Sequence, residues 1–430
     1  MEYTIPKGVF DVLPEETAEE DKWRNSNHWQ YIESIIRETA HEYGFKEIRT
    51  PIFEKTDLFI RSVGETSDIV SKEMYTFLDK GERSMTLRPE GTAPVMRSFI
   101  EKKLFNQIGP HKYYYIGPMF RYERPQAGRY RQHHQFGAEA IGNTKPEQDV
   151  EMIDLLCTIY QRLGLKNLTV MLNSVGDTAS RESYKAALTE YLRPKFEQLS
   201  PDSQIRFSKN ILRILDSKNP QDQKMLMEAP TILDFLSDES SLHLQKVRAL
   251  LDQIQIPYVI NSKLVRGLDY YNKTVFEITS GELGAQNSVG AGGRYDGLIS
   301  SLGGPNLPAV GFGTGLERLL QTMTKQHVYF PPQPHPRVFL IPLGEKAETV
   351  CFKWLHDLRK EKIAAEIDFH SKKIANSFQL AAATKSDYAL VIGDQELDIM
   401  QAKLKNMNTR EETAINLSDL INILKNLGNN

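Results

Sequence analysis

The stretch PHKYYYIGPMFRYERPQAGRYRQHHQ, residues 110–135, predicts two β-strands joined by a loop around residues 125–128. It is strongly basic, with one acid, Glu123, against five basic residues: Lys112, Arg121, Arg124, Arg129 and Arg131. Guanidinium groups on a rigid strand suit bidentate recognition of phosphate or carboxylate, and basic side chains on a loop suit the end of a nucleic acid. The same composition is also typical of a solvated basic hairpin.

Short strand-like runs continue on both sides of this hairpin. Residues 45–139 contain FKEIRTPIF, RSMTLRP and RQHHQFGAEAIG, and a further strand, LTVMLNSVGD, follows a helix. A polar helical block at about 178–253 then interrupts the strands, which resume with PYVINSKLVRGLDYY, GAGGRYDGL and AVGFGTGLERLLQTM. This order predicts an α+β domain with an antiparallel sheet and a helical insertion.

Two helix boundaries can be predicted from local patterns. Residues 17–43 have apolar residues at helical spacing and end before Gly44, which predicts one long helix. Thr144 and Glu147 fit a capping box, with Thr144 as N-cap of the next long helix.

The C-terminal part has a different texture. A proline-rich segment, KQHVYFPPQPHPR, predicts a semi-rigid linker. Beyond it the strands RVFLIPL, IAAEIDF and YALVIG alternate with helical stretches around 346–360 and 371–385. The pattern predicts a separate α/β unit of about 100 residues.

Composition sets limits on the class of protein. The 430 residues carry a formal net charge of −3, and residues 331–430 hold 13 basic and 13 acidic side chains, so bulk charge favours no anionic partner. Cys157 and Cys351 form neither a disulfide framework nor a zinc signature. The N-terminus has no signal-peptide pattern and no window holds eighteen uninterrupted apolar residues, so we expect a cytoplasmic protein without membrane contact.

Two further segments carry polar groups that a core does not need. In LVRGLDYYNKTVFEI, residues 264–278, Arg266 comes just before a strand with alternating apolar and polar residues. It is either a functional cation or part of a salt bridge at the end of the strand. In GFGTGLER, residues 311–318, position 316 is Leu, so the dinucleotide fingerprint fails. The glycines instead suit a flat ligand lying on the backbone, with Arg318 reaching it. His133 and His134 point to opposite faces of a strand, so we expect no metal there.

The order of these segments resembles a known family. GFKEIRTPIFEKTDLF, RPEGT with FRYERPQAGRYRQHHQFG, and GFGTGLERL resemble the three signature motifs of class II aminoacyl-tRNA synthetases. LVRGLDYYNKTVFE and AGGRYDGL resemble the two histidine-specific signatures of the histidyl-tRNA synthetase family, and the resemblance runs from KGVFDVLP to YALVIGDQEL. It implies a catalytic domain over 1–326 with a six-stranded antiparallel sheet and an insertion at about 178–253, a linker at 327–336, and an anticodon-binding domain over 337–430.

The resemblance also implies a reaction, in which ATP and L-histidine give histidyl-adenylate and pyrophosphate before histidine is transferred to tRNA(His). ATP is expected to bring Mg²⁺, with no prosthetic group and no metal site made of protein alone. Arg121 matches the arginine that bridges the α-phosphate and the histidine carboxylate. Arg266 matches a cation on the α-phosphate, and Arg318 matches an arginine near the γ-phosphate and adenine. Such cations suit a reaction that joins two anions. Glu123 matches the acid that reads the adenine amino group.

Histidine recognition falls on a second set of residues by the same resemblance. Glu90 and Gln135 match contacts to the amino group, with Thr92 nearby, while Glu139 and Tyr271 match the pair that grips the imidazole. Tyr295 is expected to close the pocket, and Tyr270 is assigned to structure. Buried polar partners of this kind reject ligands that cannot satisfy them.

Three expectations complete the comparison. His133 stands where related sequences commonly carry a phenylalanine that stacks on adenine, which predicts a contact sensitive to pH near the histidine pKa. Arg124 and Gln126 are expected to meet the tRNA acceptor end, and a homodimer is expected from the first motif. The alternative is a catalytically inactive, histidine-sensing or regulatory paralogue, although such proteins typically lose residues that this chain keeps: Arg121, Arg266 and Arg318.

Overall fold

The computed structural model describes residues 3–16, 18–64, 67–123, 129–281, 288–370 and 373–427. The chain divides into two compact units, residues 1–331 and 332–430. Each unit has its own hydrophobic core.

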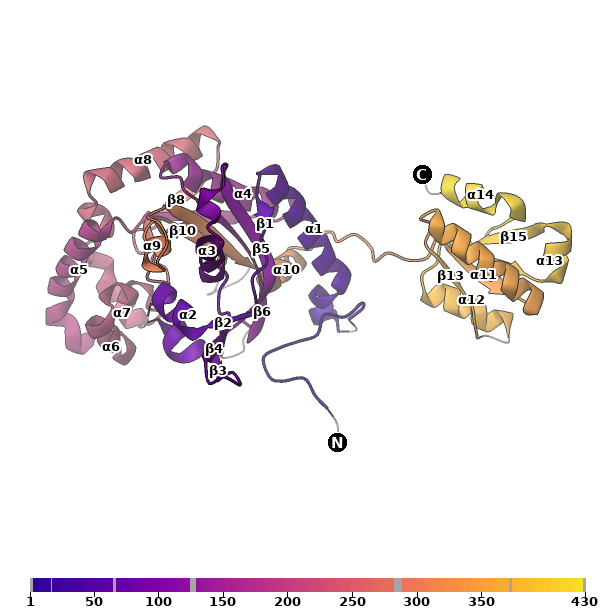
Figure 1. Ribbon diagram of the computed structural model, residues 1–430, viewed down its shortest axis with the longest axis horizontal. Helices are drawn as coiled ribbons and strands as arrows, with labels where there is room; N and C mark the ends of the chain where they lie inside the picture. Colours follow the sequence, from indigo (N-terminus) through magenta and orange to yellow (C-terminus); the bar gives the residue numbers. More distant parts are fainter. Residues whose placement is uncertain are drawn as a thin grey trace. The chain divides into compact units, whose positions relative to one another are not determined.

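A large sheet forms the centre of the first unit (Figure 1). Its eight strands follow the order β1 (Lys46–Glu47), β5 (His111–Phe120), β6 (Gln132–Ile141), β11 (Ala309–Gly315), β10 (Ser288–Arg294), β9 (Asn272–Ser280), β7 (Leu168–Ser174) and β8 (Tyr258–Ile260). The six strands from β5 to β7 are antiparallel, as expected. The two short outer strands, β1 and β8, lie within the expected runs FKEIRTPIF and PYVINSKLVRGLDYY, but they add to the six expected strands, and each pairs in parallel with its neighbour.

The predicted hairpin is the longest ladder of this sheet. Strands β5 and β6 pair over ten positions, from His111 opposite Ile141 to Phe120 opposite Gln132. Strand β6 alternates, so that Phe136, Ala138 and Ala140 enter the main core while Gln135 and Glu139 point to the opposite face. The sheet therefore separates an apolar face from a polar one.

Helices cover the apolar face. They are α1 (Ser26–Glu42), α4 (Pro146–Arg162) and α10 (Leu316–Lys325), and their buried residues join the strand residues in one cluster. A second, three-stranded sheet consists of β2 (Phe53–Lys55), β4 (Ser84–Leu87) and β3 (Tyr75–Leu78). It packs with α2 (Thr56–Val63), and the neighbouring segments are η2 (Ile69–Glu73), α3 (Thr92–Glu101), η3 (Leu104–Asn106) and α9 (Leu298–Ser301).

The long helix expected over 17–43 is wrong in its first part. The structure has a short 3-10 helix, η1 (Glu19–Arg24), and α1 begins only at Ser26. Asn25 lies between them with an extended backbone (ψ 129°), and its side-chain oxygen accepts a hydrogen bond from the Glu16 N–H at 2.6 Å. The asparagine thus breaks the helix by bonding to the preceding backbone.

The expected capping box at Thr144 is also wrong. Helix α4 begins at Pro146, and its N-cap is Lys145, whose side chain makes no capping hydrogen bond. A residue before proline is forced into an extended conformation, and Lys145 has φ −74° and ψ 143°. Proline therefore sets the boundary one residue later than the box pattern indicates.

Helices fill the chain between β7 and β8. They lie together at one side of the first unit in Figure 1. Residues 184–236 form a separate core, whereas Leu244, Val247 and Leu251 of the last helix join the main core. In order they are α5 (Thr178–Leu192), η4 (Arg193–Gln198), α6 (Pro201–Lys209), η5 (Ile211–Asp216), α7 (Pro220–Met225), η6 (Leu226–Glu228), η7 (Ile232–Phe235) and α8 (Asp238–Gln253).

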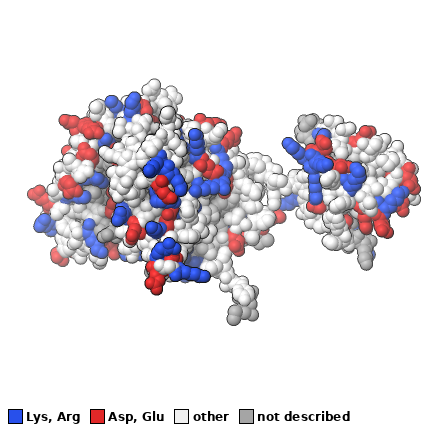
Figure 2. Space-filling model, in the orientation of Figure 1, with Lys and Arg blue, Asp and Glu red and all other residues white. Residues whose placement is uncertain are grey.

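The second unit is an α/β domain with a five-stranded sheet of order β13-β12-β14-β15-β16. Three strands are parallel, and β15 and β16 add an antiparallel edge. The elements are β12 (Val338–Pro342), α11 (Glu345–Lys360), β13 (Ala365–Ile367), α12 (Ile374–Ala383), β14 (Tyr388–Ile392), α13 (Asp394–Ile399), β15 (Gln401–Asn406), β16 (Glu412–Asn416), η9 (Leu417–Asp419) and α14 (Leu420–Asn426). Charges of both signs are interspersed over the visible face of each unit (Figure 2).

Candidate active site

A polar cavity of about 920 Å³ lies on the polar face of the large sheet. Strands β6, β9, β10 and β11 supply its floor, and residues of the helical block between β7 and β8 supply one wall. The described residues that give it its charge are Arg121, Glu123, Arg129, Arg206, Lys218, Arg266, Glu277, Arg318, Asp202, Asp216 and Glu317.

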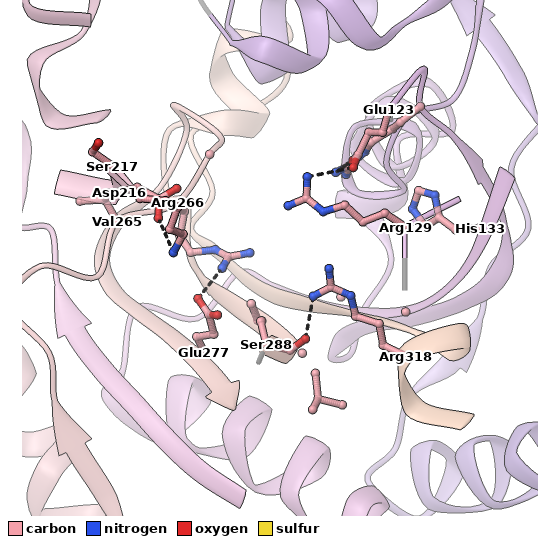
Figure 3. Close-up of a pocket in the computed structure, with 18 of the residues that line it drawn as sticks. Glu123, Arg129, His133, Asp216, Ser217, Val265, Arg266, Glu277, Ser288 and Arg318 are labelled. Atoms are coloured by element: carbon pink, nitrogen blue, oxygen red, sulfur yellow. Dashed lines mark hydrogen bonds and ion pairs between the residues drawn. The ribbon is translucent and has the colours of Figure 1, made fainter. Parts of the chain in front are cut away.

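Arginines from three separate parts of the chain reach this cavity. In Figure 3 the guanidinium groups of Arg129, Arg266 and Arg318 point into one open space. Arg129 pairs with Glu123 at 3.0 Å, and Arg266 pairs with Glu277 of β9 at 3.2 Å. The salt-bridged strand end considered for Arg266 is therefore real, and the same guanidinium also lines the cavity.

Arg121 and Arg318 are anchored by backbone carbonyls. Arg121 Nε donates to the Pro89 carbonyl at 2.8 Å, and Arg318 Nη1 donates to the Ser288 carbonyl at 2.9 Å. Burial lowers the pKa of Arg318, and repulsion from Arg129 lowers it further. An anion in the cavity would offset both costs, which makes this end of the site suited to phosphate.

A second cluster, of buried carboxyls and hydroxyls, surrounds Glu139. Its Oε1 accepts hydrogen bonds from Thr92 Oγ1 at 2.7 Å and Tyr115 Oη at 3.4 Å, and its Oε2 accepts one from Tyr295. Glu139 has no exposed surface, and this burial raises its pKa well above the usual range, with nearby Glu90 adding to the effect.

Glu90 lies at the start of α3. Its carboxylate accepts hydrogen bonds from the Thr92 and Ala93 N–H groups at 2.7 and 2.9 Å. Burial raises its pKa, although these backbone hydrogen bonds act in the opposite direction. Two adjacent carboxyls held in burial form a site suited to a cationic or hydrogen-bond-donating ligand.

Three tyrosines close this second cluster. The rings of Tyr270, Tyr271 and Tyr295 lie with centroids 4.7 to 6.0 Å apart. The assignment of Tyr270 to structure alone therefore missed a neighbour of the site, and the paired tyrosines in the sequence were the available signal. Tyr115 was also missed: its ring fills the space that Gly91 and Gly137 leave open.

The glycines of β11 make room for side chains of the site. Gly311 faces the Glu139 carboxylate and the Tyr295 hydroxyl, and Gly313 faces the Gln135 amide. Gly313 and Gly315 also line the cavity, so the expected flat ligand on this backbone stays a prediction. Gln135 lines the cavity, and its Oε1 has no hydrogen-bond partner among the residues that the structure describes.

His133 lines the cavity, and the pH sensitivity expected of it near neutrality stays a prediction. Burial, with the positive neighbours Arg121, His134 and Arg318, lowers the pKa of His133 to about 3. This direction argues against a change of charge on the ring near neutral pH. His134 turns the other way and bonds through Nδ1 to Glu317 Oε1 at 3.0 Å.

The remaining assignments concern tRNA and metals. Arg124 and Gln126 lie outside the described residues. Within the described ranges, no group of three or more His, Cys, Asp or Glu residues could hold a metal ion. The cavity carboxylates Glu123 and Glu277 are ion-paired with arginines, so they suit a metal only if it arrives with its own anionic ligand.

The antiparallel sheet, the arginines over a polar pocket and the separate α/β unit agree with the architecture expected from the resemblance to class II aminoacyl-tRNA synthetases. Family models match histidyl-tRNA synthetase over residues 8–319 and an anticodon-binding domain over residues 337–427. The chain is 55% identical to the histidine--tRNA ligase of Protochlamydia amoebophila over 426 residues, which covers 99% of this chain and all of that protein. It is 47% identical to the one from Bacillus licheniformis, with 99% of each chain covered.

A solved structure agrees with these relatives. The apo histidyl-tRNA synthetase of S. aureus superposes with a TM-score of 0.83 at 39% identity, covering 99% of this chain and all of that one. The chain therefore belongs to the histidyl-tRNA synthetase family.

Proposed function

We propose that the chain is a histidine--tRNA ligase, which activates L-histidine with ATP and transfers it to the 3′ end of tRNA(His). The observation that carries this function is the pairing of two sites on one sheet face. Arginines converge on a cavity, and buried carboxyls with hydroxyls form the neighbouring cluster. The first suits a triphosphate, and the second suits the ammonium and imidazole of histidine.

Adenylation takes place where the two sites meet. Arg121 joins them, because its Nε is anchored on Pro89, next to Glu90, while its side chain lines the cavity. From there it bridges the histidine carboxylate and the α-phosphate. Arg266 provides the second cation at the α-phosphate and Arg318 a cation at the γ-phosphate, which stabilises charge that develops during the attack.

Other groups of the cavity recognise the adenine base. Glu123 reads the adenine amino group, and the ring of His133 stacks on adenine. Glu277 lines the cavity and would be available to Mg²⁺ that arrives with ATP, where the ion would neutralise phosphate charge.

Histidine lies in the second cluster. Glu90 and Gln135, with Thr92 beside them, bind its ammonium group, and Glu139 and Tyr271 hold its imidazole while Tyr295 closes the pocket. The buried, prearranged hydroxyls around Glu139 support this assignment. A competing amino acid without two ring nitrogens would leave these groups unpaired, which makes the pocket selective.

Regions outside the pocket complete the enzyme. The catalytic domain covers residues 1–326, with its insertion at about 178–253. The linker covers residues 327–336, and the anticodon-binding domain covers residues 337–430. Arg124 and Gln126 meet the acceptor end of tRNA(His). The enzyme acts in the cytoplasm, and none of the described helices is long and apolar enough to cross a membrane.

The enzyme is a homodimer that associates through the small sheet. Ile52, Phe53, Phe77 and Leu78 lie on or beside this sheet, and each exposes 43% to 68% of its surface. The Phe53 and Phe77 rings contact each other, with centroids 6.4 Å apart. An apolar group of this kind on the surface is typical of an interface between subunits.

Charging of tRNA(His) with radiolabelled histidine tests the complete reaction. We expect label to accumulate in tRNA, dependent on ATP. A folded protein that binds histidine but never charges tRNA would favour the regulatory paralogue instead.

A further inference from the structure

The loop that carries Arg266 and Tyr271 belongs neither to a helix nor to a strand. It connects β8, which ends at Ile260, with β9, which begins at Asn272. The sheet fixes its two ends, Asn173 of β7 donates to the Leu264 carbonyl at 3.0 Å, and Glu277 of β9 pairs with the Arg266 guanidinium. The backbone that follows Leu264 is held by contacts from outside the sheet.

The helical block between β7 and β8 supplies one side of this support. Val265 packs against the separate core of that block. Asp216 and Ser217 of the block line the same cavity as Val265 and Arg266, and all four lie on one side of it in Figure 3. The residues on either side of the catalytic cation thus rest on the block.

Arg213, in helix η5 of the block, holds the same loop through polar contacts. Its Nη2 donates to the Gly267 carbonyl at 3.1 Å and lies 3.6 Å from Asp269 Oδ1. Asn210 Nδ2 donates to the same Asp269 oxygen at 3.2 Å. The Arg213 side chain is only 14% exposed, whereas the Asp269 side chain that it meets is 36% exposed.

The opposite side of the loop rests on the end of α2. The Asp269 N–H donates to the Val63 carbonyl at 3.5 Å, and the Asp269 carboxylate occupies the space beside Gly64. Gly64 has φ +95°, and a Cβ there would overlap this carboxylate. Arg213 Nη1 also lies 3.9 Å from Asp68 Oδ2, so one guanidinium meets the helical block, the loop and the segment after α2.

We propose that Arg213 is a positioning residue for adenylation, which holds the loop so that the Arg266 guanidinium lies over the cavity. This inference rests on the proposed function of that cavity. Arg213 does not line the cavity, and its effect passes through Gly267 and Asp269. Because a displacement of about 1 Å in a catalytic group can cost about 100-fold in rate, loss of this support lowers turnover without removing any group that contacts substrate.

The test is ATP–pyrophosphate exchange at saturating histidine and ATP, without tRNA. Arg213→Gln is expected to lower kcat by about 10- to 100-fold. Lys209→Gln, which removes an exposed charge from the neighbouring helix α6, is the matched control and is expected to stay within about twofold of wild type. Exchange by Arg213→Gln within twofold of wild type would overturn the inference.

A double variant separates positioning from general structural damage. If Arg213 acts through Arg266, adding Arg213→Gln to Arg266→Ala lowers the rate by less than about twofold further. Losses that multiply would show that the two residues act independently and would contradict the proposal.

Two further outcomes are distinguishable. If Arg213→Gln does not fold, Asp269→Asn removes the same ion pair from the side of the loop and carries the same expectations. Wild-type protein without histidine-dependent exchange would refute the proposed function itself, whereas normal wild-type exchange with an unaffected Arg213 variant refutes only this inference.

Discussion

Glu139 shows how a single buried carboxyl links binding to stability. Burial raises its pKa, so the folded protein keeps a proton that the unfolded chain has already lost, and the free energy of unfolding falls as pH rises through this window. Evolutionary pressure for stability alone would favour a neutral residue here. The ionisable group is explained by its use in the pocket.

Glu139→Gln is therefore expected to increase stability relative to wild type as pH rises, while it abolishes histidine-dependent exchange. The difference in Tm between variant and wild type should grow as pH rises above the ordinary glutamate pKa of about 4.3. Thermal unfolding followed by circular dichroism measures it, with exposed Glu101→Gln as control. Parallel Tm curves for Glu139→Gln and wild type would contradict the raised pKa.

His133 illustrates the reverse situation, in which an ionisable residue behaves as a neutral one. Because its pKa is lowered to about 3, replacing the imidazole by a phenyl ring should leave the pH profile of the ATP KM unchanged between about pH 6 and pH 8. Steady-state exchange with His133→Phe measures this profile. An inflection that occurs in wild type and disappears in the variant would show that His133 titrates near neutrality.

At the scale of elements, strand alternation organises both sites. One face of β6 and β11 enters the core through Phe136, Val310 and Phe312, and the other carries Gln135 and Glu139 opposite glycines. Alternate side chains of a strand point to the same face, and this alternation makes the strand amphipathic. The same alternation places the ligand-binding groups together on one face.

Gly313→Ala tests this arrangement, because the added Cβ would meet the Gln135 amide. We expect the histidine KM to rise by about tenfold with a smaller change in the ATP KM. Gly297→Ala is the control, since a Cβ there meets no atom within 4 Å. An unchanged histidine KM in Gly313→Ala would mean that the position of Gln135 does not matter for binding.

Local patterns predicted this fold well where periodicity and tertiary packing agree. The β5–β6 hairpin and strands β12, β13 and β14 of the second unit lie where the apolar pattern places them, whereas β15 and β16 were not predicted. The predicted helix boundaries are wrong where a single residue overrides the local pattern. Asn25 breaks the helix expected over 17–43, and Pro146 moves the start of α4. Strand β16 carries exposed residues at four of its five positions, so no buried face marked it.

The candidate site was only partly predictable from the sequence, because packing between separate segments brings some of its groups together. The sequence identified the arginines, because cations clustered in motifs are unusual. It did not predict that Tyr115 and Tyr270 lie beside Glu139, since that proximity depends on the packing of separate segments. Nor could it predict the pKa of His133, which depends on burial and on three positive neighbours.

At the scale of the whole molecule, the apolar residues of the small sheet predict the oligomeric state. Phe77→Asp places a charge among Ile52, Phe53 and Leu78 and is expected to convert a dimer into a monomer. Analytical ultracentrifugation measures the mass, and exposed Leu242→Asp on α8 is the matched control. A Phe77→Asp protein that remains dimeric would place the interface elsewhere.

If the two adjoining sites together form an adenylation site for histidine, purified protein without tRNA catalyses ATP–pyrophosphate exchange. Measured with each of the twenty amino acids, exchange is expected with histidine alone. We also expect Arg266→Ala to lose kcat to a far greater extent than histidine affinity. Folded protein that binds histidine but supports exchange with no amino acid would contradict it.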